Sequence, residues 1–255
     1  MNSLGRAKVP MIKEAVILAA GMGTRLSGVI AGKPKGLIVF DRYPIIEESV
    51  RKLLKHGVEK IWIVTGYQPH NFENLTEKYP GSVQTIWNPE FENSGTMYSL
   101  YCVRDYVKGS FLLLESDIIY EQKALTALIN TPSEECILLS GFSQSGDEVY
   151  VETKDNRLVC MSKDKSQLGS EPSGELVGIV KLTPKLFACM QRHAQDQFVH
   201  SLFYDYETDA LVAAGKEIDI DCLVLEDLVW AEIDDEVHLK RAKNEIYPMI
   251  KLREQ

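Results

Sequence analysis

The sequence has little of what marks secreted, zinc-binding or membrane-spanning proteins. Its five cysteines are scattered and odd in number, and none is spaced as C-x-x-C, which argues against a disulfide framework and a zinc site. The most apolar early stretch, residues 15–20, is too short to cross a bilayer, and no small-residue cleavage pattern follows it. We therefore expect a cytoplasmic protein without membrane insertion.

Positive charge is also scarce. Lysine and arginine number 28 against 37 acidic residues, which gives a net charge of −9, and there is no basic run. A nucleic-acid partner is therefore not expected, because such partners are held by clustered cations. The five histidines form no metal-like pair along the sequence, and we interpret them as surface or structural residues.

Linkers, repeats and low-complexity tracts are missing as well. At 255 residues and 45% hydrophobic composition, the chain is long enough to bury one large core. We expect a single domain over residues 13–255, preceded by an N-terminal extension of residues 1–12.

What the sequence does contain is an alternation of strand-like and helix-like segments. Helix-period segments, such as residues 45–56, separate most of the apolar β-rich runs at 15–20, 61–65, 83–87, 111–114 and 136–140. This alternation predicts an α/β fold with a Rossmann-like, mostly parallel sheet flanked by helices. The second half predicts small antiparallel additions at 148–152, 158–161 and 175–182, and then a closing helix over 234–251.

The most informative stretch joins the first apolar run to a glycine loop and to cations. Gly21 and Gly23 are followed by Arg25 and Lys35, but a dinucleotide fingerprint would need a third glycine where the chain has Leu26. The next glycine pair also fails as a P-loop, because three residues separate its glycines and a proline follows its lysine. The stretch fits a loop whose N–H groups wrap a triphosphate beside fixed positive charges. Ordinary turn glycines would leave the cations unexplained.

These residues resemble the signature of a known superfamily. The sequence LAAGMGTRL at 18–26, followed after seven residues by Pro34 and Lys35, resembles the nucleoside-triphosphate:sugar-phosphate nucleotidyltransferases. The chain is similar to the CTP-dependent members that activate phosphocholine or 2-aminoethylphosphonate in the segments 93–101, 114–117, 174–178 and 230–235. It resembles the 2-aminoethylphosphonate cytidylyltransferases most, through FLLLESD, DEV and DYE at 111–117, 147–149 and 205–207. The resemblance runs from about Lys13 to the end of the chain.

The resemblance implies transfer of CMP from CTP to 2-aminoethylphosphonate with release of pyrophosphate. The attacking oxygen, the α-phosphate and the leaving group are all anionic, so the reaction needs gathered cations more than a general base. The resemblance implies that Arg25 binds the departing phosphates. It implies that Lys35 bridges the α-phosphate and the incoming anion. The implied CTP contacts are Leu18, Ala19, Ala20, Gly21, Gly23, Thr24, Arg25, Lys35, Gly66, Ser94, Gly95, Thr96 and Ser116.

A magnesium cofactor is expected at two aspartates. Asp117 follows the apolar run 111–114, and Asp234 ends the strand-like segment 228–233. Carboxylate oxygens are the ligands that Mg²⁺ prefers, although either aspartate could instead cap a following helix. The resemblance favours the metal role for both, and it places Glu115 beside them as an orienting or crevice-lining residue.

The two family members that the chain resembles most differ in their acceptor, so the acceptor-binding residues distinguish them. A primary ammonium needs hydrogen-bond acceptors, whereas a trimethylammonium prefers an aromatic cage. The acceptor candidates are Asp147, Glu175, Asp205, Tyr206 and Glu207. The phosphocholine enzymes carry a tryptophan where this chain has Asp147 to Tyr150, and Trp62, Trp87 and Trp230 lie elsewhere in the sequence. We therefore favour 2-aminoethylphosphonate, followed by phosphocholine, for which Tyr150, Tyr204 and Tyr206 keep a partial cage open, and then a sugar 1-phosphate.

A different class of function is a nucleotide-binding module that has lost catalysis. The joint presence of Arg25, Lys35, Asp117 and Asp234 opposes it, because a binding module needs no paired metal carboxylates. The expected partners are small molecules, CTP and a phosphonate or phosphate monoester, and a homodimer is compatible with the late helices.

Overall fold

The computed structural model describes residues 12–26, 28, 30, 32–143 and 145–255. The predicted extension, residues 1–12, lies outside this part of the chain except for Ile12, whose side chain is 2% exposed and packs in the core. In the described ranges, none of the helices combines the length and the apolar character that a membrane crossing requires.

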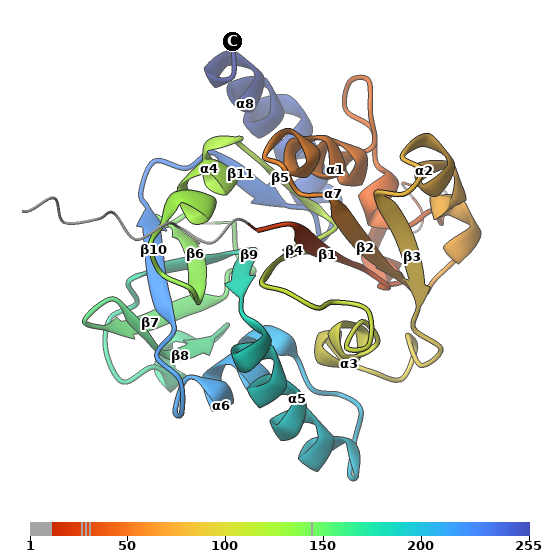
Figure 1. The fold of residues 1–255 in the computed structure, drawn as a ribbon. Helices are drawn as coiled ribbons and strands as arrows, with labels where there is room; N and C mark the ends of the chain where they lie inside the picture. Colours follow the sequence, from red (N-terminus) through yellow and green to blue (C-terminus); the bar gives the residue numbers. More distant parts are fainter. Residues whose placement is uncertain (1–11, 27, 29, 31, 144) are drawn as a thin grey trace, which may run out of the picture.

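A nine-stranded sheet forms the centre of the molecule, with helices on both of its faces (Figure 1). Its order is β3-β2-β1-β4-β9-β6-β10-β8-β7. The strands are β1 (Glu14–Ala19), β2 (Lys60–Thr65), β3 (Val83–Trp87), β4 (Phe111–Glu115), β6 (Cys136–Ser140), β7 (Tyr150–Lys154), β8 (Arg157–Ser162), β9 (Gly174–Leu182) and β10 (Asp221–Leu225). All of them except β8 and β9 run in the same direction, so the sheet is mixed but mostly parallel in strand direction.

The antiparallel additions are more central than the sequence indicated. The segment predicted at 175–182 becomes β9, which lies between β4 and β6 and is buried along its whole length. A strand buried on both faces needs apolar residues on both, and β9 supplies them in Leu176, Val177 and Ile179. The sequence analysis did not identify β10, which extends the sheet beside β6.

The helices follow the amphipathic pattern. They are α1 (Ile45–Lys55), α2 (Glu73–Lys78), α3 (Thr96–Tyr101), α4 (Lys123–Asn130), α5 (Pro184–Phe198), α6 (Val212–Ala214), α7 (Glu236–Arg241) and α8 (Tyr247–Arg253). The helix predicted at 45–56 is therefore present. The predicted closing helix is a run of α7, a π-helical turn η6 (Ala242–Ile246) and α8. Pro248 has no N–H to donate within the helix, which accounts for the altered turn directly before it.

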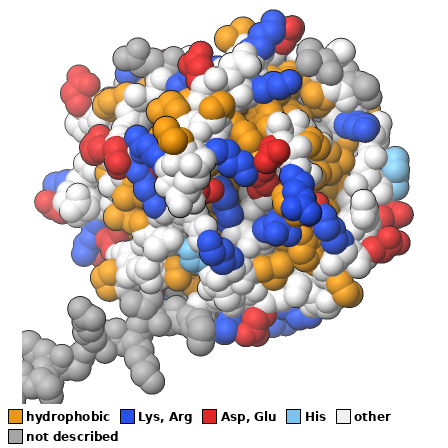
Figure 2. Space-filling model, turned by 90° about the horizontal axis from the view of Figure 1, so that it is seen from above, with side chains coloured by type: hydrophobic (Ala, Val, Ile, Leu, Met, Phe, Trp, Pro, Cys, Tyr) orange, Lys and Arg blue, Asp and Glu red, His pale blue; other side chains and the backbone are white. Residues whose placement is uncertain are grey.

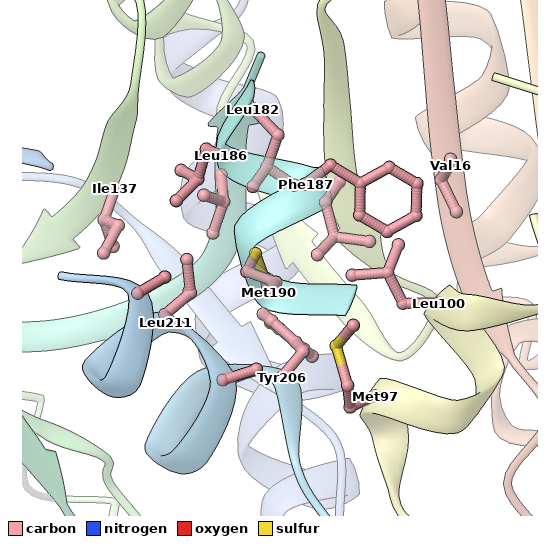
Figure 3. Packing of buried hydrophobic residues seen from close by; sticks show 14 of the residues in the cluster. Val16, Met97, Leu100, Ile137, Leu182, Leu186, Phe187, Met190, Tyr206 and Leu211 are labelled. Carbon is pink, nitrogen blue, oxygen red and sulfur yellow. The ribbon is translucent and has the colours of Figure 1, made fainter. Parts of the chain in front are cut away.

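Two hydrophobic clusters lie on the two faces of the sheet. Alternate residues of β1 enter different clusters: Val16 packs in one, and Ile17 packs in the other. On the face of Val16, α5 packs against α3, with Phe187 and Met190 of α5 near Leu100 (Figure 3). Packed side chains cover both faces, so we expect a ligand to bind at the strand ends.

A second, small sheet pairs β5 (Ile118–Tyr120) with β11 (Trp230–Glu232) in antiparallel register. The backbone N–H of Ile233 also donates to the carbonyl oxygen of Asp117 at 3.0 Å. The sequence analysis identified neither short strand as part of a pair. This ladder brings the chain after β4 next to the chain before α7, and so joins Asp117 and Asp234.

The net negative charge is not spread evenly over the surface. Figure 2 looks down on the molecule from the α8 side of Figure 1 and shows Lys and Arg side chains gathered on this face. A groove between α1 and α8 is lined by Arg51, Lys52, Lys55 and Lys251 together with Glu48 and Glu254. Acidic side chains also gather around the two cavities described next.

Candidate active site

One cavity opens where β1 and β4 end, and it contains much of the predicted nucleotide site. Its walls are formed by Leu18, Ala19, Ala20, Gly21, Pro34, Lys35, Thr96, Ser99, Glu115, Ser116, Asp117, Glu207 and Glu232. The carboxyl ends of parallel strands are where open α/β sheets bind ligands, so the position fits the loop chemistry. We call this the nucleotide cavity.

The glycines beside this cavity are required by close approaches. Gly23 has a φ of +60°, and a Cβ there would lie 2.9 Å from Cγ of Lys35. A Cβ on Gly66 would lie 2.6 Å from the carbonyl oxygen of Ala20. These glycines therefore let the loop pack against Lys35 and let the end of β2 pack against the end of β1.

The remaining predicted CTP contacts surround this region without lining the cavity. A Cβ on Gly95 would lie 2.5 Å from the carbonyl oxygen of Tyr204, and the hydroxyl of Ser94 accepts a hydrogen bond from Asn88. Thr24 lies in the short 3₁₀ turn after the glycine loop. Five of the predicted CTP contacts therefore lie beside the nucleotide cavity and outside its lining: Gly23, Thr24, Gly66, Ser94 and Gly95.

Lys35 is the centre of the charged constellation. Its Nζ lies 2.6 Å from Oδ2 of Asp117 and 2.6 Å from Oδ1 of Asp234, and its side chain is mostly buried. Burial alone would lower the pKa of Lys35, but the two carboxylates outweigh it and raise the pKa above its ordinary value. Lys35 is therefore a fixed cation across the working pH range.

The two aspartates face the same point, and neither caps a helix. Asp117 lies in the turn between β4 and β5, and the cap of α7 is Asp235, whose side chain accepts from the N–H of His238. Burial alone would raise the pKa of Asp234, but its interactions with Asp147 and with Lys35 lower it. Asp234 is therefore held as an anion directly beside the lysine.

Arg25 is more exposed than Lys35 and reaches across to the second half of the chain. One guanidinium nitrogen lies 3.2 Å from Asp147, and the other lies 3.4 Å from Asp234. Asp147 also pairs with Lys163 at 3.0 Å. Asp147 therefore links the glycine loop to β8 and its neighbours.

A second cavity lies on the far side of Asp234 and shares walls with the first. It is lined by Glu115, Ser143, Ser145, Asp147, Glu148, Val149, Lys163, Leu176, Gly178, Glu207, Trp230, Ala231, Glu232, Asp234, His238 and Arg241. Glu115, Glu207 and Glu232 line both cavities. We call this the acceptor cavity. Acidic side chains dominate its polar wall.

Glu175 lies next to the acceptor cavity rather than on its surface. It is 1% exposed, its Oε2 accepts from the N–H of Ser143 at 2.9 Å, and its Oε1 is buried with no partner among the described residues. Burial raises the pKa of Glu175. A cationic group in the cavity would relieve the isolation of this oxygen.

Asp205 and Tyr206 hold other parts of the site in place and are not among the residues that line either cavity. Asp205 accepts from the backbone N–H of Thr96 at 3.0 Å, and the hydroxyl of Tyr206 donates to Glu115 at 2.6 Å. Glu207, by contrast, lines both cavities and accepts from the hydroxyl of Thr96. Of the predicted acceptor residues, Asp147 and Glu207 therefore reach the cavity directly.

Sequence reasoning missed the side chains that come from the end of the chain. Trp230 was set aside because it lies far from residues 147–150 in the sequence, yet the β5–β11 ladder places it on the wall of the acceptor cavity. His238 and Arg241 of α7 lie on the same wall, and Arg241 donates to the carbonyl oxygen of Ser143. Sequence position alone could not reveal this, because the ladder has only three residues on each strand.

The shared wall concentrates buried negative charge. Burial, followed by the nearby carboxylates, raises the pKa of Glu115, of Glu207 and of Glu232. Buried acids with raised pKa values are the environment in which a bound cation is most strongly favoured, because the cation restores their charged form.

These carboxylates fit a hard divalent cation. Glu115, Asp117 and Glu232 each offer an oxygen, and these oxygens lie within 4.8 Å of one another. Oxygen donors in this number suit Mg²⁺, which keeps water and phosphate oxygens for its other positions. The predicted pair was Asp117 and Asp234. The structure groups Asp117 with Glu115 and Glu232, whereas Asp234 lies outside this group and is joined to Asp117 through Lys35.

Comparison with known proteins identifies the family. A family model described as "MobA-like NTP transferase domain" matches residues 15–209. A 2-aminoethylphosphonate cytidylyltransferase of Lancefieldella rimae is 27% identical over 232 residues, which cover 89% of this chain and 90% of that protein. A choline-phosphate cytidylyltransferase of Streptococcus pneumoniae is 28% identical over 155 residues, 57% of this chain and 67% of the relative. A protein described as "Bifunctional protein GlmU" of Methanococcus maripaludis is 28% identical over 188 residues, which cover 72% of this chain and 43% of that longer protein.

The fold has close counterparts among solved structures. The inositol-1-phosphate CTP transferase from T. maritima superposes with a TM-score of 0.79 at 21% identity, covering 95% of this chain and 96% of that one. The mixed sheet with its flanking helices is thus the nucleotide-diphospho-sugar transferase fold.

Proposed function

This chain belongs to the MobA-like NTP transferase family and is a nucleotidyltransferase, and we propose that it transfers CMP from CTP to 2-aminoethylphosphonate. The phosphonate oxygen of the acceptor would attack the α-phosphorus of CTP, the bond to the bridging oxygen of the β-phosphate would break, and pyrophosphate would leave. The similarity to a 2-aminoethylphosphonate cytidylyltransferase over nine-tenths of both chains supports this substrate.

The observation that carries the proposal is the acidic acceptor cavity directly beside Lys35. An acceptor with a phosphonate at one end and an ammonium at the other needs both cations and carboxylates, and the wall of this cavity carries Lys163 and Arg241 beside its acidic side chains. Lys35 and Arg25 pair with Asp234 on the wall of this cavity and would hold the anionic end. Glu148 and Glu207 line the cavity and would accept from the ammonium, together with the unpartnered oxygen of Glu175 just behind the wall.

Positioning and charge neutralisation account for the reaction. The phosphonate is already ionised near neutral pH, so no side chain has to remove a proton from the nucleophile. Lys35 would bridge the α-phosphate and the attacking oxygen, and it would stabilise the charge that develops between them. Asp117, Asp234, Glu115 and Glu232 are the residues that would hold Mg²⁺, which when bound neutralises phosphate oxygens as a Lewis acid.

Phosphocholine is the second candidate acceptor, and Trp230 is the observation in its favour. An indole face attracts a quaternary ammonium, which has no N–H for the carboxylates. A choline-phosphate cytidylyltransferase among the relatives points the same way. The two acceptors differ at both ends, since one joins a phosphonate to a primary ammonium and the other joins a phosphate ester to a trimethylammonium. Offering both in one assay compares them.

The test measures pyrophosphate release by the purified chain with CTP and Mg²⁺, offering 2-aminoethylphosphonate, phosphocholine and glucose 1-phosphate in parallel. UTP replaces CTP in a second series. Asp117→Asn is the inactivating variant, and Asp105→Asn, whose side chain is 77% exposed, is the matched control.

We expect a kcat/KM at least tenfold higher for 2-aminoethylphosphonate than for phosphocholine, which corresponds to about 1.4 kcal/mol of discrimination. Activity should be lost in Asp117→Asn and kept in Asp105→Asn. A preference for phosphocholine would make phosphocholine the acceptor and Trp230 the side chain that recognises its ammonium group. A preference for the sugar phosphate or for UTP would overturn the proposal.

A further inference from the structure

A second cluster of metal-ligating side chains lies away from both cavities, on α5. The ligand atoms of Cys189, His193 and Glu217 all lie within 4.8 Å of one another, and Nε2 of His193 is 2.8 Å from Oε1 of Glu217. None of these residues lines the nucleotide cavity or the acceptor cavity. Cys189 and His193 are four residues apart on one helix, so they project from the same face.

The donors differ in kind from those of the active site. The active-site carboxylates offer only oxygen, whereas this cluster combines a thiol, an imidazole and a carboxylate. Sulfur and imidazole ligands suit Zn²⁺ and related metals rather than Mg²⁺. We propose that Cys189, His193 and Glu217 form a binding site for a thiophilic divalent metal ion such as Zn²⁺, with a water molecule as the fourth ligand.

The ligand atoms, all within 4.8 Å of one another, can reach the spacing that such an ion needs through small side-chain rotations. Zn–S and Zn–N bonds of about 2.3 and 2.0 Å place tetrahedral ligand atoms roughly 3.5 Å apart. The side chain of Glu217 is 44% exposed, so its rotation can bring the carboxylate to the ion without disturbing the core. Cys189 is buried at 7% exposure, and this keeps the thiol on the inner side of the site.

Arg192 already supplies a positive charge to this cluster. It donates to the sulfur of Cys189 at 3.1 Å and to Glu217 at 2.7 Å. Its side chain is 55% exposed and long enough to turn into solvent. Binding would exchange this guanidinium for the ion, and the thiol proton would pass to the buffer as the thiolate forms. Arg192 is therefore a competitor for the site, which gives a sharp test.

The position suggests what the ion would do. α5 packs against the π-helical turn η5 (Tyr206–Leu211) and against α6, and the backbone N–H of Glu217 donates to the carbonyl oxygen of Ala214 at the end of α6. An ion held by α5 and Glu217 would tie these elements together. Because η5 carries Tyr206 and Glu207, the ion would brace the segment behind the acceptor cavity without touching the reacting groups.

The experiment uses Co²⁺ as the probe, since a thiolate bound to Co²⁺ gives a near-ultraviolet charge-transfer band and oxygen-only sites do not. The purified full chain is stripped with a chelator and titrated with Co²⁺, and Zn²⁺ is then added to displace the band. The variants are Cys189→Ser and, in case that change impairs folding, His193→Ala and Glu217→Gln. Cys160→Ser is the matched control, because Cys160 is half-buried and free but outside the cluster.

We expect a band that saturates at one Co²⁺ per chain, is displaced by Zn²⁺ and is lost in Cys189→Ser but kept in Cys160→Ser. His193→Ala and Glu217→Gln should weaken Co²⁺ binding at least tenfold. Arg192→Gln should tighten it by about tenfold, because the competing cation is gone. The absence of a band, or a band unchanged in Cys189→Ser, would overturn the proposal. The readout needs no CTP, so it succeeds or fails independently of the nucleotidyl transfer.

Discussion

The nucleotide cavity and the acceptor cavity share a wall but are built in different ways. The nucleotide side depends on the end of β1, on Lys35 and on glycines that permit close approach, namely Gly23, Gly66 and Gly95. The acceptor side depends on charged side chains from loops and strands spread over the second half of the chain. The difference indicates that the nucleotide grip is a backbone property, whereas acceptor choice depends on a few replaceable side chains.

The largest expected effect follows from removing Lys35, which lines the nucleotide cavity and pairs with Asp234 on the wall of the acceptor cavity. Lys35→Met should lower kcat/KM by about 10³-fold or more, since a fixed charge at the developing transition state is lost. Steady-state pyrophosphate release measures this loss, and thermal unfolding checks that the fold survives. Lys33→Met is the control, because Lys33 is exposed. A similar loss in both variants would contradict a specific role of Lys35 in stabilising the transition state.

Asp147 tests whether the two cavities are separable, because it pairs with Arg25 on one side and Lys163 on the other. Asp147→Asn should lower kcat/KM by about thirtyfold and raise KM for both substrates, since positioning on both sides loosens. Asp155→Asn, in the exposed turn between β7 and β8, should behave like the wild type. A rise in the acceptor KM alone would assign Asp147 wholly to the acceptor side.

Glu175 sharpens the comparison from the acceptor side. Glu175→Gln should raise KM for 2-aminoethylphosphonate by about tenfold, because a charge-assisted hydrogen bond to the ammonium is lost. KM for CTP should not change. Glu171→Gln, at an exposed acid on the loop before β9, is the matched control. Equal effects on both substrates would mean that Glu175 supports the fold rather than the acceptor.

Trp230 should have a smaller and more selective effect. Trp230→Leu should lower kcat/KM for phosphocholine by about threefold or more, which is the scale of a cation–π contact. The value for 2-aminoethylphosphonate should change less. Trp87→Leu serves as the control, since Trp87 is 58% exposed and lies outside both cavities. Parallel losses with both acceptors would show that the indole shapes the cavity without sensing the ammonium.

The smallest effect is on stability. Burial raises the pKa of Glu175, so its protonated form suits the folded state, and the associated stability is present below the ordinary carboxyl pKa. That stability is lost as the pH rises through the higher folded-state pKa. Glu175→Gln should therefore raise Tm by about 2–4 °C at pH 8 and leave it unchanged near pH 4. A Tm lowered at pH 8 would mean that the ionised carboxylate stabilises the fold.

The sequence predicted the features that rest on neighbouring residues better than those that rest on tertiary packing. The α/β fold and the glycine loop were predictable because each rests on local periodicity or on contiguous residues. The pairing of Asp117 with Asp234 was implied by resemblance, but its cause, the β5–β11 ladder, was not predictable because three-residue strands carry too little pattern. Trp230 and the cluster around Cys189 were missed for a related reason, since what brings them into place is tertiary packing.

The small β5–β11 ladder also fixes the order in which the site can be completed during protein synthesis. A chain growing from its N-terminus contains Lys35 and Asp117 long before Asp234 has been translated. Until β11 has left the ribosome, the lysine has only one of its two carboxylate partners, and the acceptor cavity lacks the wall that carries Trp230. We therefore expect a nascent chain to be inactive until β11, the last strand in the described part of the chain, has paired with β5.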